Sequence, residues 1–107
     1  MRITQGRCPT HPGKYIKEDI LEEMNLTQQQ LAERLYVSRR TINQIVNLKR
    51  SITTEMALRL GMFTRTSPEM WINLQSAFDL WNAREDINKT NINDIKPILE
   101  ETILEKA

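Results

Sequence analysis

The stretch of sequence that decides the fold runs from residue 27 to residue 47 and reads TQQQLAERLYVSRRTINQIVN. It contains two helix starts in succession. Thr27 and Gln30 form a capping box, in which each side chain can bond the backbone N–H of the other residue. Ser38 is a good N-cap for a second helix, so only Tyr36 and Val37 separate the two. Two short helices joined by so tight a turn predict a helix-turn-helix.

Each of these two helices has one apolar stripe at helical spacing. The stripe of the first helix is formed by Leu31, Ala32 and Leu35, and that of the second by Ile42, Ile45 and Val46. All other residues from 38 to 47 are polar or basic. The second helix is therefore expected to bury its stripe and to present the polar residues to a partner.

Those polar residues have the chemistry of DNA recognition. Arginine can pair with O6 and N7 of guanine, and glutamine or asparagine with N6 and N7 of adenine. We expect one group of side chains to read bases in the major groove, namely Arg39, Arg40, Thr41 and Gln44. A second group is expected to hold the DNA backbone, namely Thr27, Gln28, Ser38, Asn43, Asn47, Lys49 and Arg50.

The distribution of charge supports a polyanionic partner. The net charge of the chain is only +1, but residues 1–50 carry nine Lys and Arg against five Asp and Glu, and the remainder carries six against nine. Residues 34–50 contain five cations and no acid. Such a block indicates a basic face aimed at nucleic acid. A solvated helical face explains the cluster equally well when it is taken alone.

Further helix starts complete an all-α, five-helix prediction resembling a phage repressor. Pro12 suits the first turn of a helix that precedes the two helices of the motif. After the motif, Thr53 caps the fourth helix of the chain, and Ser67-Pro68-Glu69 opens the fifth, which runs to about Arg84. We expect a flexible arm over residues 1–10 and a DNA-binding domain over residues 11–85.

Residues 86–107 are expected to form a linker followed by a short amphipathic helix. Pro97 suits a first turn, so the expected start is near Asn93 or Asp94. The apolar face of this helix would be Ile98, Leu99, Thr102 and Ile103. Six acids and three bases from residue 85 onward make it either a partner-binding element or a solvated tail.

Composition excludes several functional classes. At 107 residues the chain is one domain, and it has no apolar run of the ~18–20 residues that a membrane helix needs. It has no leader-like segment and a single cysteine, Cys8, which fits a cytoplasmic location and excludes an internal disulfide. No metal-ligand spacing, phosphate loop or nucleophile motif is present, so we expect no enzyme, cofactor or metal.

Five residues outside the motif are expected to have structural roles. His11 beside a helix start is interpreted as a cap, Trp71 and Trp81 as core residues, and the polar Asn73 and Gln75 as bonding a neighbouring helix end or lining a dimer interface.

The helix-turn-helix stretch resembles the phage-repressor Cro/C1 family, also called XRE. The wider frame is similar to HigA-type antitoxins, also named virulence-associated protein I. That likeness rests on HPGKY at residues 11–15, on SITTEMALRL at residues 51–60 and on TSPEMWINLQ at residues 66–75. It covers about His11 to Ala83, and its last segment is the most specific to the family.

This resemblance implies a homodimer that binds an inverted-repeat operator in double-stranded DNA. It also implies a partner, a RelE-like, mRNA-cleaving toxin called HigB, and repression of the operon that encodes both proteins. Two residues depart from the family pattern, because Leu48 and Tyr36 stand where glycine is usual. Leucine in the left-handed region costs roughly 1 kcal/mol or more, unless the turn has another geometry.

Two other functions remain open at this point. A stand-alone repressor of phage or plasmid type would have the same DNA-binding face and no toxin partner. A protein-interaction module would carry the basic face incidentally.

Overall fold

The structure is a computed structural model that describes residues 7–99, and within that range it contains helices and no strand. Its five α-helices are α1 (Pro12–Tyr15), α2 (Gln28–Leu35), α3 (Arg39–Val46), α4 (Thr54–Thr64) and α5 (Pro68–Glu85). A π-helix, η1 (Ile16–Glu22), continues α1, and the 3₁₀ turns η2 (Ile87–Lys89) and η3 (Ile92–Asp94) follow α5. The all-α, five-helix prediction is confirmed. None of the described helices is both long and apolar enough to cross a membrane.

The helices begin where the sequence predicts. Thr27, Ser38, Thr53 and Ser67 each accept a hydrogen bond from the backbone N–H three residues later. The capping box is complete, because the backbone N–H of Thr27 also donates to Oε1 of Gln30 at 2.9 Å. Each cap satisfies a backbone donor that the helix itself leaves free.

Four helical segments end in the same way, with one non-glycine residue in the left-handed region. The φ angles are 54° at Asn25, 59° at Tyr36, 61° at Leu48 and 59° at Arg65. After Tyr36, the N–H of Val37 donates to the carbonyl of Ala32, which is the six-to-one bond of a Schellman motif. Asparagine tolerates this conformation best, and the other three positions each carry the cost of about 1–2 kcal/mol of a left-handed Cβ.

The segment after α1 is a π-helix, although its apolar residues recur at a spacing that also fits an α-helix. Its hydrogen bonds span five residues, as in the 3.1 Å bond from the N–H of Glu23 to the carbonyl of Glu18. Ile16, Ile20 and Leu21 are buried, whereas Tyr15 and Met24 are 37% and 48% exposed. The apolar residues therefore form two faces, one in the core and one at the surface.

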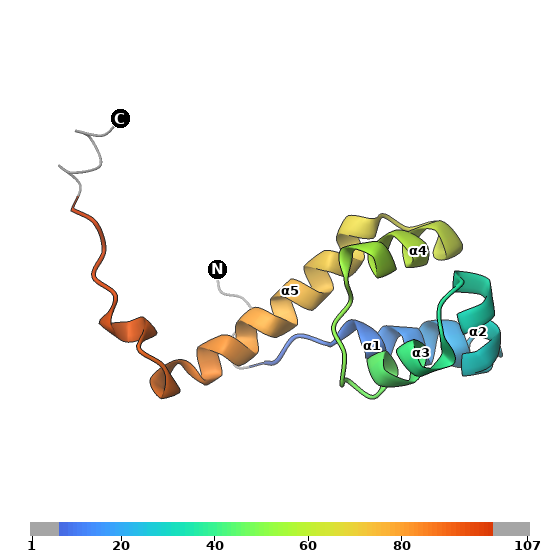
Figure 1. The fold of residues 1–107 in the computed structure, drawn as a ribbon, viewed down its shortest axis with the longest axis horizontal. Coiled ribbons are helices and arrows are strands. Elements are labelled where there is room, and N and C mark those ends of the chain that lie inside the picture. The colour runs from blue at the N-terminus through green and yellow to red at the C-terminus, as the bar shows by residue number, and fades with distance from the viewer. Residues whose placement is uncertain (1–6, 100–107) are drawn as a thin grey trace.

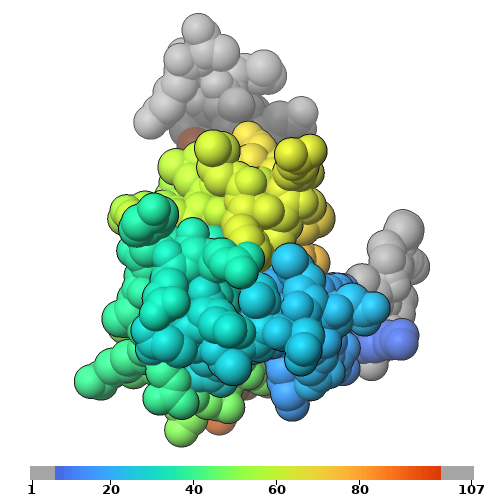
Figure 2. All heavy atoms as spheres, turned by 90° about the vertical axis from the view of Figure 1, so that its right-hand side faces the viewer, coloured from blue at the N-terminus to red at the C-terminus, as the bar shows by residue number. Residues whose placement is uncertain are grey.

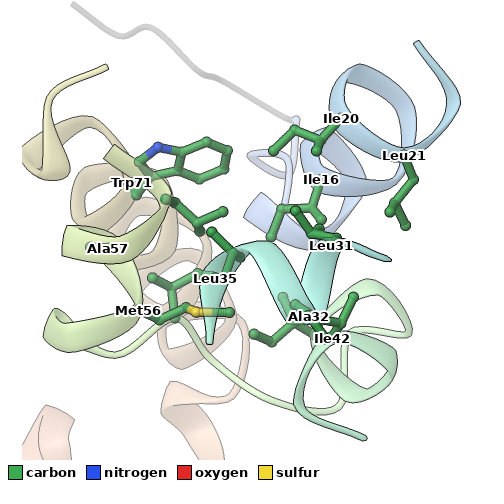
Figure 3. Close-up of a cluster of buried hydrophobic side chains, with 13 residues drawn as sticks. Ile16, Ile20, Leu21, Leu31, Ala32, Leu35, Ile42, Met56, Ala57 and Trp71 are labelled. Carbon is green, nitrogen blue, oxygen red and sulfur yellow. The ribbon is translucent and has the colours of Figure 1, made fainter. Parts of the chain in front are cut away.

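The core joins α2 and α3 to η1, α4 and α5 (Figures 1 and 3). Its fully buried aliphatic side chains are Ile16, Leu31, Ile42, Ile45 and Leu60. Figure 2 shows α2, in cyan, between the blue η1 and the yellow-green α4. Burial of one such side chain contributes about 1.5–3 kcal/mol, so this core holds the two helices of the motif against the rest of the domain.

Helix α5 extends beyond the other helices, and its first half ties them together (Figure 1). Trp71 is buried, as expected, and Trp81 is only half-buried. Gln75 is 5% exposed, and its Oε1 accepts from the N–H of Ile52 at 2.8 Å. It therefore bonds the segment before α4, one of the two roles predicted for it, whereas Asn73 is exposed.

The start of α1 is packed tightly between α3 and α5. His11 caps it as predicted, since its Nδ1 accepts from the N–H of Gly13 at 2.8 Å, and its ring meets Phe78 edge-on. Burial lowers the pKa of His11 below its ordinary value, and the carboxylate of Asp79 opposes this shift. A Cβ on Gly13 would lie 2.1 Å from the carbonyl oxygen of Ile45, so only glycine allows this approach to α3.

The C-terminal segment differs from the expected amphipathic helix. Residues 92–94 form η3, and residues 95–99 are not helical, so the predicted start near Asn93 or Asp94 is wrong. Ile95 is extended, with φ −69° and ψ 129°. Pro97 opposes a helix through this segment, because it lacks an N–H and disfavours the helical conformation in Lys96, the residue before it. Thr102 and Ile103 lie outside the described residues, as do residues 1–6 of the arm expected over residues 1–10.

Candidate nucleic-acid interface

Helix α3 buries one face and leaves the opposite one open. Ile42 and Ile45 are buried where α3 packs against α1 and α2, while Arg39, Arg40 and Asn43 are exposed. Thr41 and Gln44 are partly buried at the edges of the open face. The apolar stripe of the sequence thus points inward, and the residues proposed to read bases lie on the side away from the core.

The cations of the basic block in the sequence are all at the surface. All five of its cations, Arg34, Arg39, Arg40, Lys49 and Arg50, have exposed side chains. None of the five makes an ion pair within 4.0 Å with any carboxylate of residues 7–99. Their charge is therefore not neutralised by those residues, and it is available to an anion in solvent.

The start of α3 is linked to the loop that follows it. The hydroxyls of Ser38 and Thr41 are hydrogen-bonded at 2.9 Å, and Nη1 of Arg50 donates to Oγ1 of Thr41 at 3.4 Å. Arg50, which comes nine residues later in the sequence, thus lies beside the first turn of α3. The Thr41 hydroxyl is occupied by these partners, which leaves its methyl group as the portion free to meet a base.

A second bond joins the two helices of the motif on the same surface. Nδ2 of Asn43 donates to Oε1 of Gln28 at 3.2 Å. Because the carbonyl end of the Gln28 amide faces Asn43, its NH₂ end is free to donate elsewhere. Gln28 is also the first residue of α2, where backbone N–H groups can receive a phosphate.

The turn after α3 positions the last members of the predicted site. Leu48 adopts the left-handed conformation that glycine usually takes, so the turn is unchanged by the larger residue. The N–H of Lys49 donates to the carbonyl of Gln44 at 2.8 Å, and that of Leu48 to Ile45 at 3.0 Å. This Schellman motif ends α3. The residues around it, Asn47, Lys49 and Arg50, have exposed side chains.

One residue that supports the site was missed by the sequence analysis. Arg59 of α4 donates through Nη1 to the carbonyl of Leu35 at 2.8 Å, and through Nη2 to Glu55 at 2.6 Å. It thereby satisfies the end of α2 and attaches the motif to α4. The spacing of Glu55 and Arg59, four residues apart on one helix, was the signal available. A depression of about 290 Å³ lined by Arg50, Arg59 and Thr41 lies between α3 and α4.

Comparison with known proteins identifies this arrangement. The helix-turn-helix family model matches residues 17–71. Virulence-associated protein I of Dichelobacter nodosus is 41% identical over 88 residues, which are 82% of this chain and 80% of that protein. Antitoxin HigA-1 of Vibrio cholerae is 37% identical over 84 residues, 78% of each chain. The solved Pseudomonas aeruginosa antitoxin HigA with the higBA promoter is 38% identical, with a TM-score of 0.77, over 85% of this chain and 99% of that one.

Proposed function

The chain belongs to the HigA-type antitoxin family of XRE helix-turn-helix proteins, also named virulence-associated protein I, and we propose that it is the antitoxin of a type II toxin–antitoxin module. In this role it binds an operator as a sequence-specific autorepressor. It also neutralises a HigB- or RelE-like toxin that cleaves mRNA.

The observation that carries the DNA-binding half is the open face of α3. Arg39 and Arg40 are exposed on its first turn and have no ion-pair partner in the described chain, so their guanidinium groups are free to donate to guanine. Gln44, one turn after Arg40, is positioned to reach an adenine. Thr41 would add apolar contact through its methyl group. A relative of the same fold has been solved with its promoter, which supports this use of the motif.

The backbone contacts follow from the surroundings of that face. Gln28 and Asn43 are bonded to each other and would hold a phosphate near the start of α2. Thr27 and Ser38 stabilise the two helix starts as caps, and their neighbouring N–H groups would face further phosphates. Asn47 and Lys49 would contact the backbone beyond the other end of α3, and Arg50 would contact it beside the first turn. These residues set orientation and affinity, whereas the bases are read by α3.

A homodimer is part of the proposal, because one short helix reads only a few base pairs. Two copies of α3 about 34 Å apart would meet successive major grooves of an inverted repeat. The second half of α5 projects from the domain and carries an exposed Leu80 and a half-buried Trp81. A second copy would remove this apolar surface from water.

The test joins growth and DNA binding. The open reading frame adjacent to this gene is expressed with and without this protein, and the protein is titrated with the DNA upstream of the pair. We expect growth arrest by the neighbour alone, rescue by this protein, and binding to the upstream DNA that exceeds binding to a scrambled duplex. A harmless neighbour together with specific DNA binding would leave a stand-alone repressor. Loss of DNA binding at every salt concentration would leave a protein-interaction module.

A further inference from the structure

A groove lies away from the predicted DNA-binding surface, and no residue of α2 or α3 lines it. It has a volume of about 600 Å³, and its walls come from α1, η1, the end of α4 and the start of α5. Its main apolar residues are Tyr15, Met24, Phe63, Met70 and Leu74. A space of this size takes one or two inserted side chains of a partner.

The π-helix is what creates one wall of the groove. In an α-helix, Tyr15 and Met24 would lie on opposite sides, because nine residues are two and a half turns. The hydrogen bonds of η1 span five residues, which lengthens each turn. Tyr15, Ile20 and Met24, at intervals of five and four residues, therefore share the side that faces α5. Such insertions in helices are frequent at functional sites.

The polar atoms inside the groove are already bonded to one another. Nε1 of Trp71 donates to Oγ1 of Thr66 at 2.9 Å, and the Thr64 hydroxyl donates to the carbonyl of Leu60 at 2.7 Å. A ligand entering the groove therefore finds satisfied polar groups and an apolar surface. Affinity there must come from apolar burial, together with the charge at the rim.

Two methionines flank the opening. Met24 is 48% exposed and Met70 is 39% exposed, and they stand on the two opposite walls. Methionine side chains are pliable and are frequent on protein-docking surfaces. Apolar surface left open in this way indicates a partner that covers it.

The charge around the groove indicates what kind of partner fits. Asp19 of η1 and Arg65 after α4 both line the groove. On the η1 side, residues 16–25 carry four carboxylates against one lysine, all with exposed side chains. The block around α3 carries five cations and no acid. A cationic protein is therefore attracted to the η1 side and repelled from the α3 side.

Resting on the antitoxin function above, we propose that this groove is the docking site for the toxin. An enzyme that cleaves RNA must hold a phosphate backbone, so its surface is cationic. An apolar side chain of the toxin enters between Met24 and Met70, and basic groups beside it face Asp19 and the other acids of η1. Because the groove shares no residue with the predicted DNA-binding set, one chain can hold the toxin and the operator together.

The experiment uses the full chain and the purified product of the adjacent open reading frame, titrated by calorimetry. Met24→Lys and Met70→Lys place a cation in either wall. Met62→Lys is the matched control, since Met62 is 83% exposed on α4, is not among the residues that line the groove, and gains the same charge. We expect toxin binding at least tenfold weaker for both groove variants and within twofold of native for the control. Asp19→Asn should weaken binding several-fold at low salt and reduce its salt dependence. Operator affinity should stay within twofold of native throughout.

The outcomes separate the inference from the function on which it rests. Groove variants that bind the toxin as the native chain does overturn the inference and leave the antitoxin function standing. A native chain that binds no neighbour product overturns both. If a groove variant has a lower mass than the native chain in sedimentation without toxin, the groove is an interface between copies of this chain. That result overturns the toxin assignment. If Met70→Lys unfolds, as its circular dichroism would reveal, Met24→Lys and Asp19→Asn decide.

Discussion

Replacing Gly13 with alanine tests the contact that positions α3, the helix proposed to read bases. The new Cβ would lie 2.1 Å from the carbonyl oxygen of Ile45 on α3, whereas real Cβ contacts are almost never shorter than 3.0 Å. The two backbones would have to separate by roughly 0.9 Å, the difference between these distances. Neither side can yield by rotating a side chain, because the obstacle is backbone.

The magnitude follows from two opposing effects. Overpacking a tight contact costs about 1–3 kcal/mol. Replacing glycine by alanine in a helix returns about 0.5–1 kcal/mol, because the unfolded chain loses freedom. We expect a net loss of about 1–2 kcal/mol of unfolding free energy, and a melting temperature lower by roughly 5–15 °C for a domain of this size.

The assay is urea and thermal unfolding followed by far-UV circular dichroism. Gly61→Ala is the graded control, because its Cβ would meet the carbonyl oxygen of Thr66 at 2.9 Å, close to the accepted limit. It should cost less than half as much as Gly13→Ala. A Gly13→Ala protein as stable as the native chain would refute the close approach of α1 to α3 and the reasoning built on it.

Three further predictions concern DNA binding and pH. Arg40→Ala should cost about 1–3 kcal/mol of operator-binding free energy and relax selectivity at one base position. Binding to a panel of single-base operator variants measures both effects. Equal losses on operator and scrambled DNA would show that Arg40 does not read a base. Lys49→Ala should weaken binding to all sequences alike and lower the slope of log K against log salt by about one, and an unchanged slope would remove Lys49 from the phosphate contacts. The pKa of His11 is lowered in the folded chain, so below the ordinary value of about 6.5 the unfolded chain binds more protons than the folded one. The stability that neutral His11 contributes at pH 7 is therefore lost as the pH falls below 6.5. Urea unfolding of native protein and His11→Asn at pH 7.5 and 5.5 measures this, and an equal loss for both on acidification would contradict it.

The helix-turn-helix could be predicted from sequence because its signals are local. A cap such as Thr27 and its partner Gln30 are three residues apart, and the apolar stripe of α3 lies within one helix. The candidate site was predictable to the same extent, since its residue types sit on the side of α3 left over by that stripe. That Arg50 lies beside Thr41, and that Gln28 bonds Asn43, required the packed structure, since these bonds span nine and fifteen residues.

Other features were decided by competition between local preference and packing. The segment after α1 has a helical apolar pattern, but in the structure it is a π-helix that places Ile16, Ile20 and Leu21 in the core and leaves Tyr15 and Met24 exposed. The expected C-terminal helix has an apolar stripe too, but residues 95–99 are not helical, and Pro97 opposes continuation of a helix from Asn93 or Asp94 through Lys96.

By itself, the sequence determined the helix starts, the helix-turn-helix and the polar face of α3, because caps and periodic stripes act within a few residues of each other. Only the tertiary structure decided which residues meet across helices: the contact of Gly13 with Ile45, the bond of Gln75 to Ile52, and the groove between η1 and α5. Those contacts form only when distant segments of the backbone are placed to within tenths of an ångström, and no local pattern in the chain encodes that placement.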